Sequence, residues 1–149
     1  MNVKELLYNE CVAFVNNRLQ TIESIISSNK KALHSETKSS AGDKHETGRA
    51  MLQLEMEKAS QQLAGITQMK EILNRIDISK TSKNAHLGSI VFTNKVNYFL
   101  AISAGKLTAS GKDFFAVSVS SPIGKLLLGK QENNEVTFSG KSIKIKQIL

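Results

Sequence analysis

The chain has a single cysteine, Cys11, a single proline, Pro122, and no tryptophan. One thiol cannot form an internal disulfide, and no spacing of Cys and His resembles a metal site. Cys11 falls within an amphipathic helical pattern, so we expect it to pack in a core rather than to act as a nucleophile. No apolar run approaches the ~20 residues that a membrane span needs. The N-terminus, which carries Glu5, lacks the apolar core of a signal peptide, so we expect a soluble, cytoplasmic protein without a membrane partner.

Acidic residues are scarce in the second half of the chain. The whole sequence has 20 basic and 13 acidic residues, a net charge of +7. Residues 1–84 hold 12 basic and 10 acidic residues, a net +2, whereas residues 85–149 hold 8 and 3, a net +5. A basic segment of this kind favours nucleic acid or an acidic protein surface as a partner. Solubility alone is the alternative explanation of the surplus lysines.

Residues 3–38 contain neither glycine nor proline and carry a heptad-like apolar stripe, which predicts a long helix. A helix-breaking segment, 39–42, follows, and residues 44–77 repeat the stripe. The two stripes consist of Cys11, Val15, Leu19, Ile22, Ile26, Asn29 and Leu33, and of Leu52, Met56, Ala59, Leu63, Ile66, Met69, Leu73 and Ile76.

Two long stripes joined by a short turn bury themselves best by folding back on each other. The first domain, 1–78, is therefore predicted to be an antiparallel coiled-coil hairpin with an acidic tip near 39–47. At ~1.5 Å per residue each helix would be roughly 50 Å long, so most of the hairpin should protrude. A monomer is expected, and a dimer of two hairpins is the alternative.

Residues 79–86 are polar and form a predicted linker to a second domain, 87–149. There the period becomes alternating, which predicts a small, mainly antiparallel sheet, and hence an α+β protein. The expected strands are Leu87–Thr93, Val96–Ser103, Phe114–Val119, Val136–Phe138 and Ile143–Leu149, with turns at Gly105, Gly111 and Ser139-Gly140. One short helix is expected over 121–129, because Ser121 suits the N-cap, Pro122 the first turn and Gly129 the stop.

Two motifs resemble the Gre-type transcript cleavage factors, a family that binds bacterial RNA polymerase. The family's hairpin tip carries Gly-Asp-x-x-Glu, matched by Gly42-Asp43-Lys44-His45-Glu46. Its second domain carries Val-x-Ser-Pro-Ile-(Ala/Gly)-x-x-Leu-Leu-Gly-Lys, matched by residues 119–130, with Glu135-Val136 after them. The resemblance covers nearly the whole chain, and it implies an FKBP-like fold for the second domain.

The resemblance implies a transcription elongation factor with polymerase- and DNA-binding functions. Such a factor enters the polymerase's secondary channel and stimulates the polymerase's own cleavage of backtracked RNA. Asp43 and Glu46 would then be the donated catalytic carboxylates, sharing a weakly held Mg²⁺ with the polymerase near the RNA 3′ end. The chain would not be an enzyme by itself. Ser120, Ser121 and Pro122 would contact the polymerase rim, and Lys38 and Arg49 are candidate RNA contacts.

The tip departs from the family pattern after the shared acids. Where the family continues with Asn-Ala-Glu-Tyr, this chain has Thr47-Gly48-Arg49-Ala50, so a base replaces an acid and a methyl group replaces an aromatic ring. This change motivates a second hypothesis, a regulator that occupies the secondary channel without stimulating cleavage.

Two alternatives do not involve cleavage at all. Asp43 and Glu46 also have the spacing of a capping box, which would satisfy amide donors at the start of the second helix. The hairpin could likewise be a dimerisation or scaffold element, with the basic domain binding another protein or acting as a prolyl isomerase. Few aromatic residues are present to line a proline pocket, which weighs against the isomerase.

Overall fold

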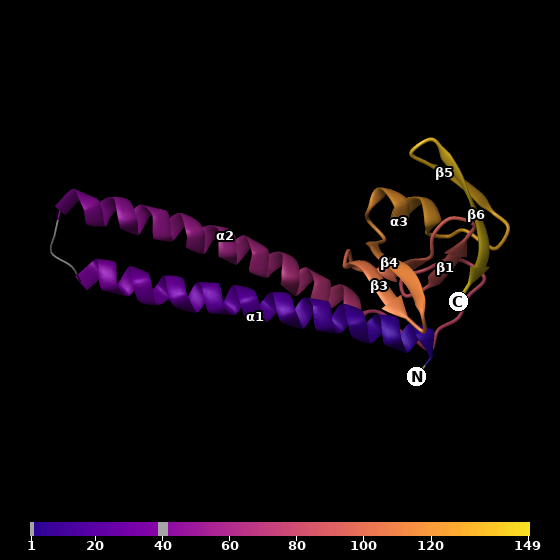
Figure 1. Cartoon of the computed structure of the whole chain (residues 1–149), viewed down its shortest axis with the longest axis horizontal. Coiled ribbons are helices and arrows are strands. Elements are labelled where there is room, and N and C mark those ends of the chain that lie inside the picture. The colour runs from indigo at the N-terminus through magenta and orange to yellow at the C-terminus, as the bar shows by residue number, and fades with distance from the viewer. Residues whose placement is uncertain (1, 39–41) are drawn as a thin grey trace. The chain divides into compact units, whose positions relative to one another are not determined.

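The structure is a computed structural model that describes residues 2–38 and 42–149. This part of the chain contains three helices and six strands (Figure 1). In chain order they are α1 (Val3–Lys38), α2 (Gly42–Asn74), β1 (Ile90–Thr93), β2 (Tyr98–Ala101), β3 (Gly105–Ala109), β4 (Lys112–Ser118), α3 (Pro122–Leu127), β5 (Glu135–Phe138) and β6 (Lys141–Ile148). No helix within these ranges is long and apolar enough to cross a membrane. The predicted α+β class, a helical hairpin followed by a sheet with a short helix, is confirmed.

The chain forms two compact units. One consists of residues 15–69 and is termed the hairpin unit; the other consists of residues 1–14 and 70–149 and is termed the sheet unit. The sheet unit therefore contains the first turns of α1 and the end of α2 as well as every strand that the structure describes.

In the hairpin unit α1 and α2 run side by side in opposite directions (Figure 1). Every residue of the two predicted stripes is buried or half-buried along the chain, as expected for a seam between two helices. Val15 and Ile22 of α1 and Ala59 and Ile66 of α2 are among the most buried. Hydrophobic burial along this seam, rather than helix propensity, stabilises two helices of this length.

The end of α2 differs from the prediction, which placed it at residue 77. The α-helix ends at Asn74, and the next two amides bond three residues back: Arg75 N to Ile72 O at 3.1 Å and Ile76 N to Leu73 O at 3.2 Å. These shorter bonds tighten the chain into a final turn, which is a usual way for a helix to end. The apolar stripe continues to Ile76, two residues beyond the helix, because Ile76 packs against Gly88 within the sheet unit.

One polar side chain, Asn29, is buried in the seam of the hairpin unit. Its exposed fraction is 8%, and its Nδ2 has no hydrogen-bond partner among the described residues. An unsatisfied buried amide lowers stability. In paired helices a polar residue at such a position commonly fixes the pairing register.

The sheet has the strand order β3-β4-β2-β1-β6-β5. Strands β2 and β4 pair in parallel, and the other neighbours pair antiparallel. The predicted, mainly antiparallel sheet is therefore correct, but β3 was not predicted. That strand has only two buried side chains, Leu107 and Ala109, and lies at the edge of the sheet, so its apolar pattern is weak.

Tight turns fix the register of two hairpins. Ser110-Gly111 joins β3 to β4 and Ser139-Gly140 joins β5 to β6, and all four residues have positive φ angles between 52° and 75°. A two-residue loop with two positive φ angles matches the twist of the flanking strands. The turns expected at these places are confirmed, whereas Gly105 is the first residue of β3 rather than a turn residue.

One face of the sheet packs against α3. Its core contains Ala85, Val91, Tyr98, Leu100, Ile123, Leu127, Val136, Ile143, Ile145 and Ile148. Because side chains alternate along a strand, Phe99 lies on the opposite face, together with its register partner Ile90. Phe99, Ile90 and Phe114 have exposed fractions of 0%, so this second face is covered as well.

The ends of the two long helices contribute to that second core. Leu7 and Cys11 of α1 are fully buried, and the Tyr8 hydroxyl donates a hydrogen bond to Leu73 O at 3.1 Å. A Cβ atom placed on Gly88, beside β2, would lie 2.9 Å from Cγ2 of Ile76. The core role predicted for Cys11 is thus confirmed, and burial raises the pKa of its thiol to about 12.

Candidate functional site

The predicted tip acids lie in the first turns of α2. The helix begins at Gly42, and Asp43 and Glu46 are its second and fifth residues. The side chains of residues 36–46 lie outside the described part of the structure, as do residues 39–41 altogether. Asp43 therefore lies inside the helix, so the capping box that would make it the N-cap does not match these bounds. A carboxylate in the first turn, the position of Asp43, is favoured by the helix dipole by about 0.3–1 kcal/mol, whereas Glu46 lies beyond that turn.

The basic residues near the tip are placed on both helices. Arg49 is exposed on α2, one turn beyond Glu46, and Lys30 and Lys31 are exposed on α1. Lys38 is the last residue of α1, and its side chain lies outside the described part. A candidate RNA contact can therefore be described only at Arg49, whose guanidinium could reach phosphate oxygens.

The donor chemistry of the tip suits Mg²⁺ but does not complete a site. Mg²⁺ prefers oxygen ligands and is commonly held by one or two carboxylates together with waters and substrate phosphates. Asp43 and Glu46 fit such a partial donor set. Among the residues whose placement is described, no group of three or more His, Cys, Asp or Glu side chains could hold a metal ion.

The corner between β4 and α3 contains the predicted polymerase contact. The Ser121 hydroxyl donates to Ser118 O at 2.6 Å and accepts from Gly124 N at 3.1 Å. Ser121 has an extended backbone, with φ −71° and ψ 160°, and Pro122 follows in the first turn of α3. The predicted N-cap is therefore confirmed, and each element of it comes from local sequence.

Ser118, which was not among the predicted site residues, holds this corner together. Its carbonyl oxygen accepts hydrogen bonds from both the amide and the hydroxyl of Ser121. Its hydroxyl lies 2.8 Å from that of Ser120 and accepts from Ser120 N at 3.2 Å. No local pattern marks Ser118 as an acceptor, because its role depends on how α3 folds back onto the end of β4.

Gly124 lets the helix approach the strand closely. A Cβ atom at this position would lie 1.9 Å from Ser118 O. Since contacts under about 3 Å are not tolerated, this position of α3 requires glycine. The corner is thus rigid, with Ser120 and Pro122 exposed and Ser121 half-buried.

An open cavity of about 560 Å³ lies beside the segment that precedes β1. Its lining is mostly polar: Thr81, Ser82, Lys83, Gln131, Glu132 and Ile148. A proline-binding pocket needs apolar and aromatic walls, and this lining contains no aromatic ring. The cavity therefore gives no support to the prolyl isomerase alternative.

No family model matches the chain, and no curated protein matches it. One solved structure that resembles it is the crystal structure of the GreA factor homolog 1 (Gfh1) protein of Thermus thermophilus. The two are 17% identical, the match covers 95% of this chain and 94% of that chain, and the TM-score is 0.35. A likeness at this level carries no argument about function, which must come from the residues themselves.

Proposed function

We propose that this protein is a Gre-like transcription elongation factor that binds RNA polymerase and stimulates the polymerase's cleavage of backtracked RNA. The supporting observation is that α2 begins at the Gly-Asp-x-x-Glu motif. Asp43 and Glu46 thus sit where two long helices meet, and the motif containing Ser121 forms a rigid corner in the same chain.

The hairpin supplies the carboxylates. Two acids three residues apart in a helical turn lie on neighbouring positions of the helix surface, so both can converge on one cation. Bound Mg²⁺ stabilises the attacking and leaving oxygens of a phosphodiester in such reactions. The chain's own contribution is to carry two negative charges at the end of a helix pair and to orient a water molecule. Neither acid completes a site alone, so the isolated protein should cleave no RNA.

The β4–α3 corner supplies an anchor for the polymerase. Ser120 and Pro122 are exposed, whereas the Ser121 hydroxyl is already engaged in two hydrogen bonds within the corner. A contact made here would involve the Ser120 hydroxyl and the Pro122 ring, with Ser121 acting as the support that keeps them in place.

The test is an RNA cleavage assay on a backtracked elongation complex with Mg²⁺. We expect the factor to produce a shortened RNA that the polymerase can extend again. The double variant Asp43→Asn, Glu46→Gln keeps the shape of both side chains but removes two charges. It should lose at least about 100-fold of the stimulation, on the scale of removing a catalytic electrostatic group, and should still bind the polymerase.

A matched control removes two acids elsewhere on the same helices. Glu23 and Glu57 are both exposed, so Glu23→Gln with Glu57→Gln makes the same change in net charge without touching the tip. Equal losses of cleavage stimulation in both double variants would mean that only the net charge of the protein matters. Cleavage that survives in the tip variant would exclude the donation of Asp43 and Glu46 to the metal.

The residues at Arg49 and Ala50 favour a second candidate function, a channel regulator that does not stimulate cleavage. Both are exposed on α2 beyond the acids. The variant Arg49→Glu, Ala50→Tyr introduces the acid and the ring at these positions. If the native chain binds the polymerase without cleavage and this variant gains cleavage, the regulator is the correct assignment. Lack of polymerase binding, with dimerisation measured by light scattering, would favour the scaffold alternative.

A further inference from the structure

A β-bulge at the end of β6 breaks the alternation of the sheet. Phe92 of β1 pairs with Gln147, but the next residue, Thr93, pairs with Ile145, so Lys146 is an extra residue. As a result Lys146 and Gln147 are consecutive exposed residues between buried Ile145 and Ile148. Bulges of this kind re-aim side chains and recur next to functional sites.

The bulge lies beside an aromatic ring that is half-buried. Phe92 shares its sheet face with its partner Gln147, and its ring meets that of Phe114 edge to face, with centroids 5.9 Å apart and an interplanar angle of 75°. Nζ of Lys112 lies over the Phe92 ring, 5.9 Å from its centroid. The result is a row in which Lys112, Phe92 and Lys146 follow one another across the sheet.

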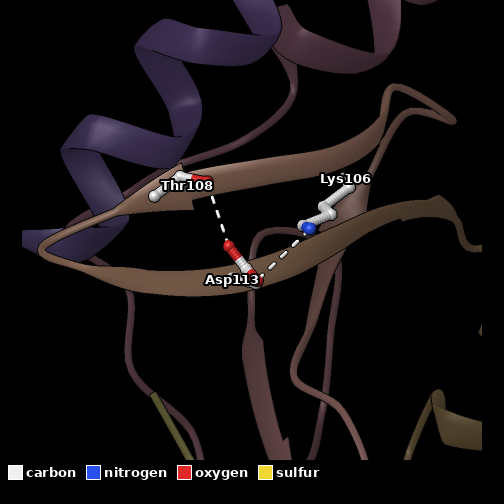
Figure 2. A network of polar contacts seen from close by, with 3 residues as sticks. All are labelled: Lys106, Thr108 and Asp113. Carbon is white, nitrogen blue, oxygen red and sulfur yellow. Dashed lines mark hydrogen bonds and ion pairs between the residues drawn. The ribbon is translucent and has the colours of Figure 1, made fainter.

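The acidic residues of these strands do not neutralise the row. Because side chains alternate along a strand, Asp113 lies on the opposite face of β4 from Lys112. It forms an ion pair with Lys106 at 3.4 Å and accepts a hydrogen bond from Thr108 at 3.0 Å (Figure 2). Glu135 is the register partner of Lys144 in the β5–β6 pair, so its charge lies beside Lys144 rather than beside Lys112 or Lys146. Neither Lys112 nor Lys146 forms an ion pair with any residue that the structure describes.

We propose that Lys112, Phe92 and Lys146 form a binding surface for a single-stranded nucleic acid, separate from the tip and from the β4–α3 corner. Two ammonium groups flanking an aromatic ring can hold successive phosphates while a base stacks on the ring. The cation–π contact at Lys112 is worth only about 0.5–1 kcal/mol at an exposed site, so its ammonium can move to a phosphate and free the ring.

Single strands are favoured over duplexes because a duplex keeps its bases stacked on one another. They are favoured over an acidic protein because the ring offers nothing specific to a carboxylate, whereas every base has a face that stacks. The row runs from β4 across β2 and β1 to β6, a span of four strands, so it should contact only a few nucleotides and bind weakly. We expect a Kd on the order of 10–100 µM near physiological salt.

The test measures binding of the full chain to fluorescent eight-nucleotide oligo(dT) and oligo(U) by anisotropy over a range of salt concentrations. Lys112→Gln with Lys146→Gln should weaken binding about ten-fold at low salt. It should also reduce the slope of log K against log salt by about 1.4, since each phosphate contact on a single strand contributes ~0.7. Retained far-UV circular dichroism shows that the variant is folded.

The matched control is Lys125→Gln with Lys141→Gln, which removes the same charge from α3 and from the opposite end of β6. Lys141 and Lys146 are five positions apart along the strand, roughly 17 Å. This variant should lose less than three-fold in affinity. Equal losses in the two double variants would mean that only net charge matters and would overturn the proposed surface.

The ring is tested separately. Phe92→Leu should lower affinity about five-fold or more with an unchanged salt slope, because stacking on an aromatic side chain is worth ~1–3 kcal/mol per base. Phe92→Tyr should retain wild-type affinity and shows that the position tolerates replacement. Tighter binding of a duplex or of poly-glutamate than of the oligonucleotides would overturn the choice of ligand, and no binding at low salt would overturn the proposal as a whole.

Discussion

Replacing Gly124 by alanine should destabilise the sheet unit, although alanine is the better helix former. The added Cβ would lie 1.9 Å from Ser118 O, well inside the 3.4 Å of an ordinary contact. The obstacle is a backbone carbonyl rather than a flexible side chain. To relieve the overlap, α3 must therefore move away from the end of β4 by more than 1 Å.

The cost follows from the contacts that such a movement breaks. Ser118 O accepts from Ser121 N at 3.1 Å and from the Ser121 hydroxyl at 2.6 Å, and each bond contributes about 1 kcal/mol. Loss of the N-cap contact to residue 124 costs about 1 kcal/mol more, while the helix propensity of alanine returns about 1 kcal/mol. The net loss is about 2 kcal/mol, and any gap left around Ile123 and Leu127 adds to it.

Gly65→Ala is the matched control. Gly65 lies inside α2 with nothing within 4 Å of an added Cβ, so the same substitution should stabilise the hairpin unit by about 0.5–1 kcal/mol. Urea unfolding followed by circular dichroism measures both changes, and amide hydrogen exchange assigns each to its unit. A Gly124→Ala variant as stable as the native chain would show that α3 adjusts freely and that the close approach to Ser118 O does not require glycine.

Three further predictions concern buried groups. Burial, helped by the charge of Glu10, raises the pKa of Cys11 to about 12, so between about pH 9 and 12 the folded state keeps a proton that the unfolded state loses. The free energy of unfolding should therefore fall with rising pH over this window, by about 1.4 kcal/mol per pH unit. The Cys11→Ala variant should lack this pH-dependent fall. If urea unfolding gives the same pH dependence for both proteins, the prediction is wrong. For Lys4, whose Nζ donates to Lys80 O at 2.9 Å, burial lowers the pKa and outweighs the opposing effect of Asp77. Just below pH 10.5 the unfolded state therefore binds more protons than the folded state, so Lys4 makes the free energy of unfolding rise with pH in that range. Lys4→Met should remove this rise. An unchanged pH profile of the variant would refute the prediction. Asn29→Leu removes a buried side chain whose Nδ2 has no hydrogen-bond partner among the described residues, so it should raise the free energy of unfolding by about 1 kcal/mol. A fall in the urea midpoint would show that the amide is needed.

Local signals in the sequence predicted the parts of the fold that local chemistry decides. The stripe residues of the long helices recur every three or four positions, and a seam between two helices needs that spacing and little else. The short helix α3 was predicted from Ser121, Pro122 and Gly129, each of which acts within a few residues of itself. The same holds for the Ser110-Gly111 and Ser139-Gly140 turns, where positive φ angles are needed.

Features that depend on partners distant in sequence could not be predicted. All four residues of β2 are buried, so no alternation shows that Phe99 and Leu100 face different cores. Ser118 accepts hydrogen bonds only because α3 folds back on β4. The bulge at Lys146 exists only in the register with β1, so the exposed pair at 146 and 147 has no local signature. The acids of the tip were recognised by a motif, and their roles stay predictions.

The sheet unit is discontinuous in the chain, since residues 1–14 pack with residues 70–149. During synthesis the segment that includes Leu7 and Cys11 leaves the ribosome before the strands that it helps to cover. The two helices of the hairpin unit, which lies between these segments in the sequence, can pair before the strands are synthesised. A fragment that starts at residue 87 should therefore leave the face of Phe99 and Phe114 uncovered and aggregate. Exchange of the sheet unit between related proteins would require both ends of the chain to be transferred together.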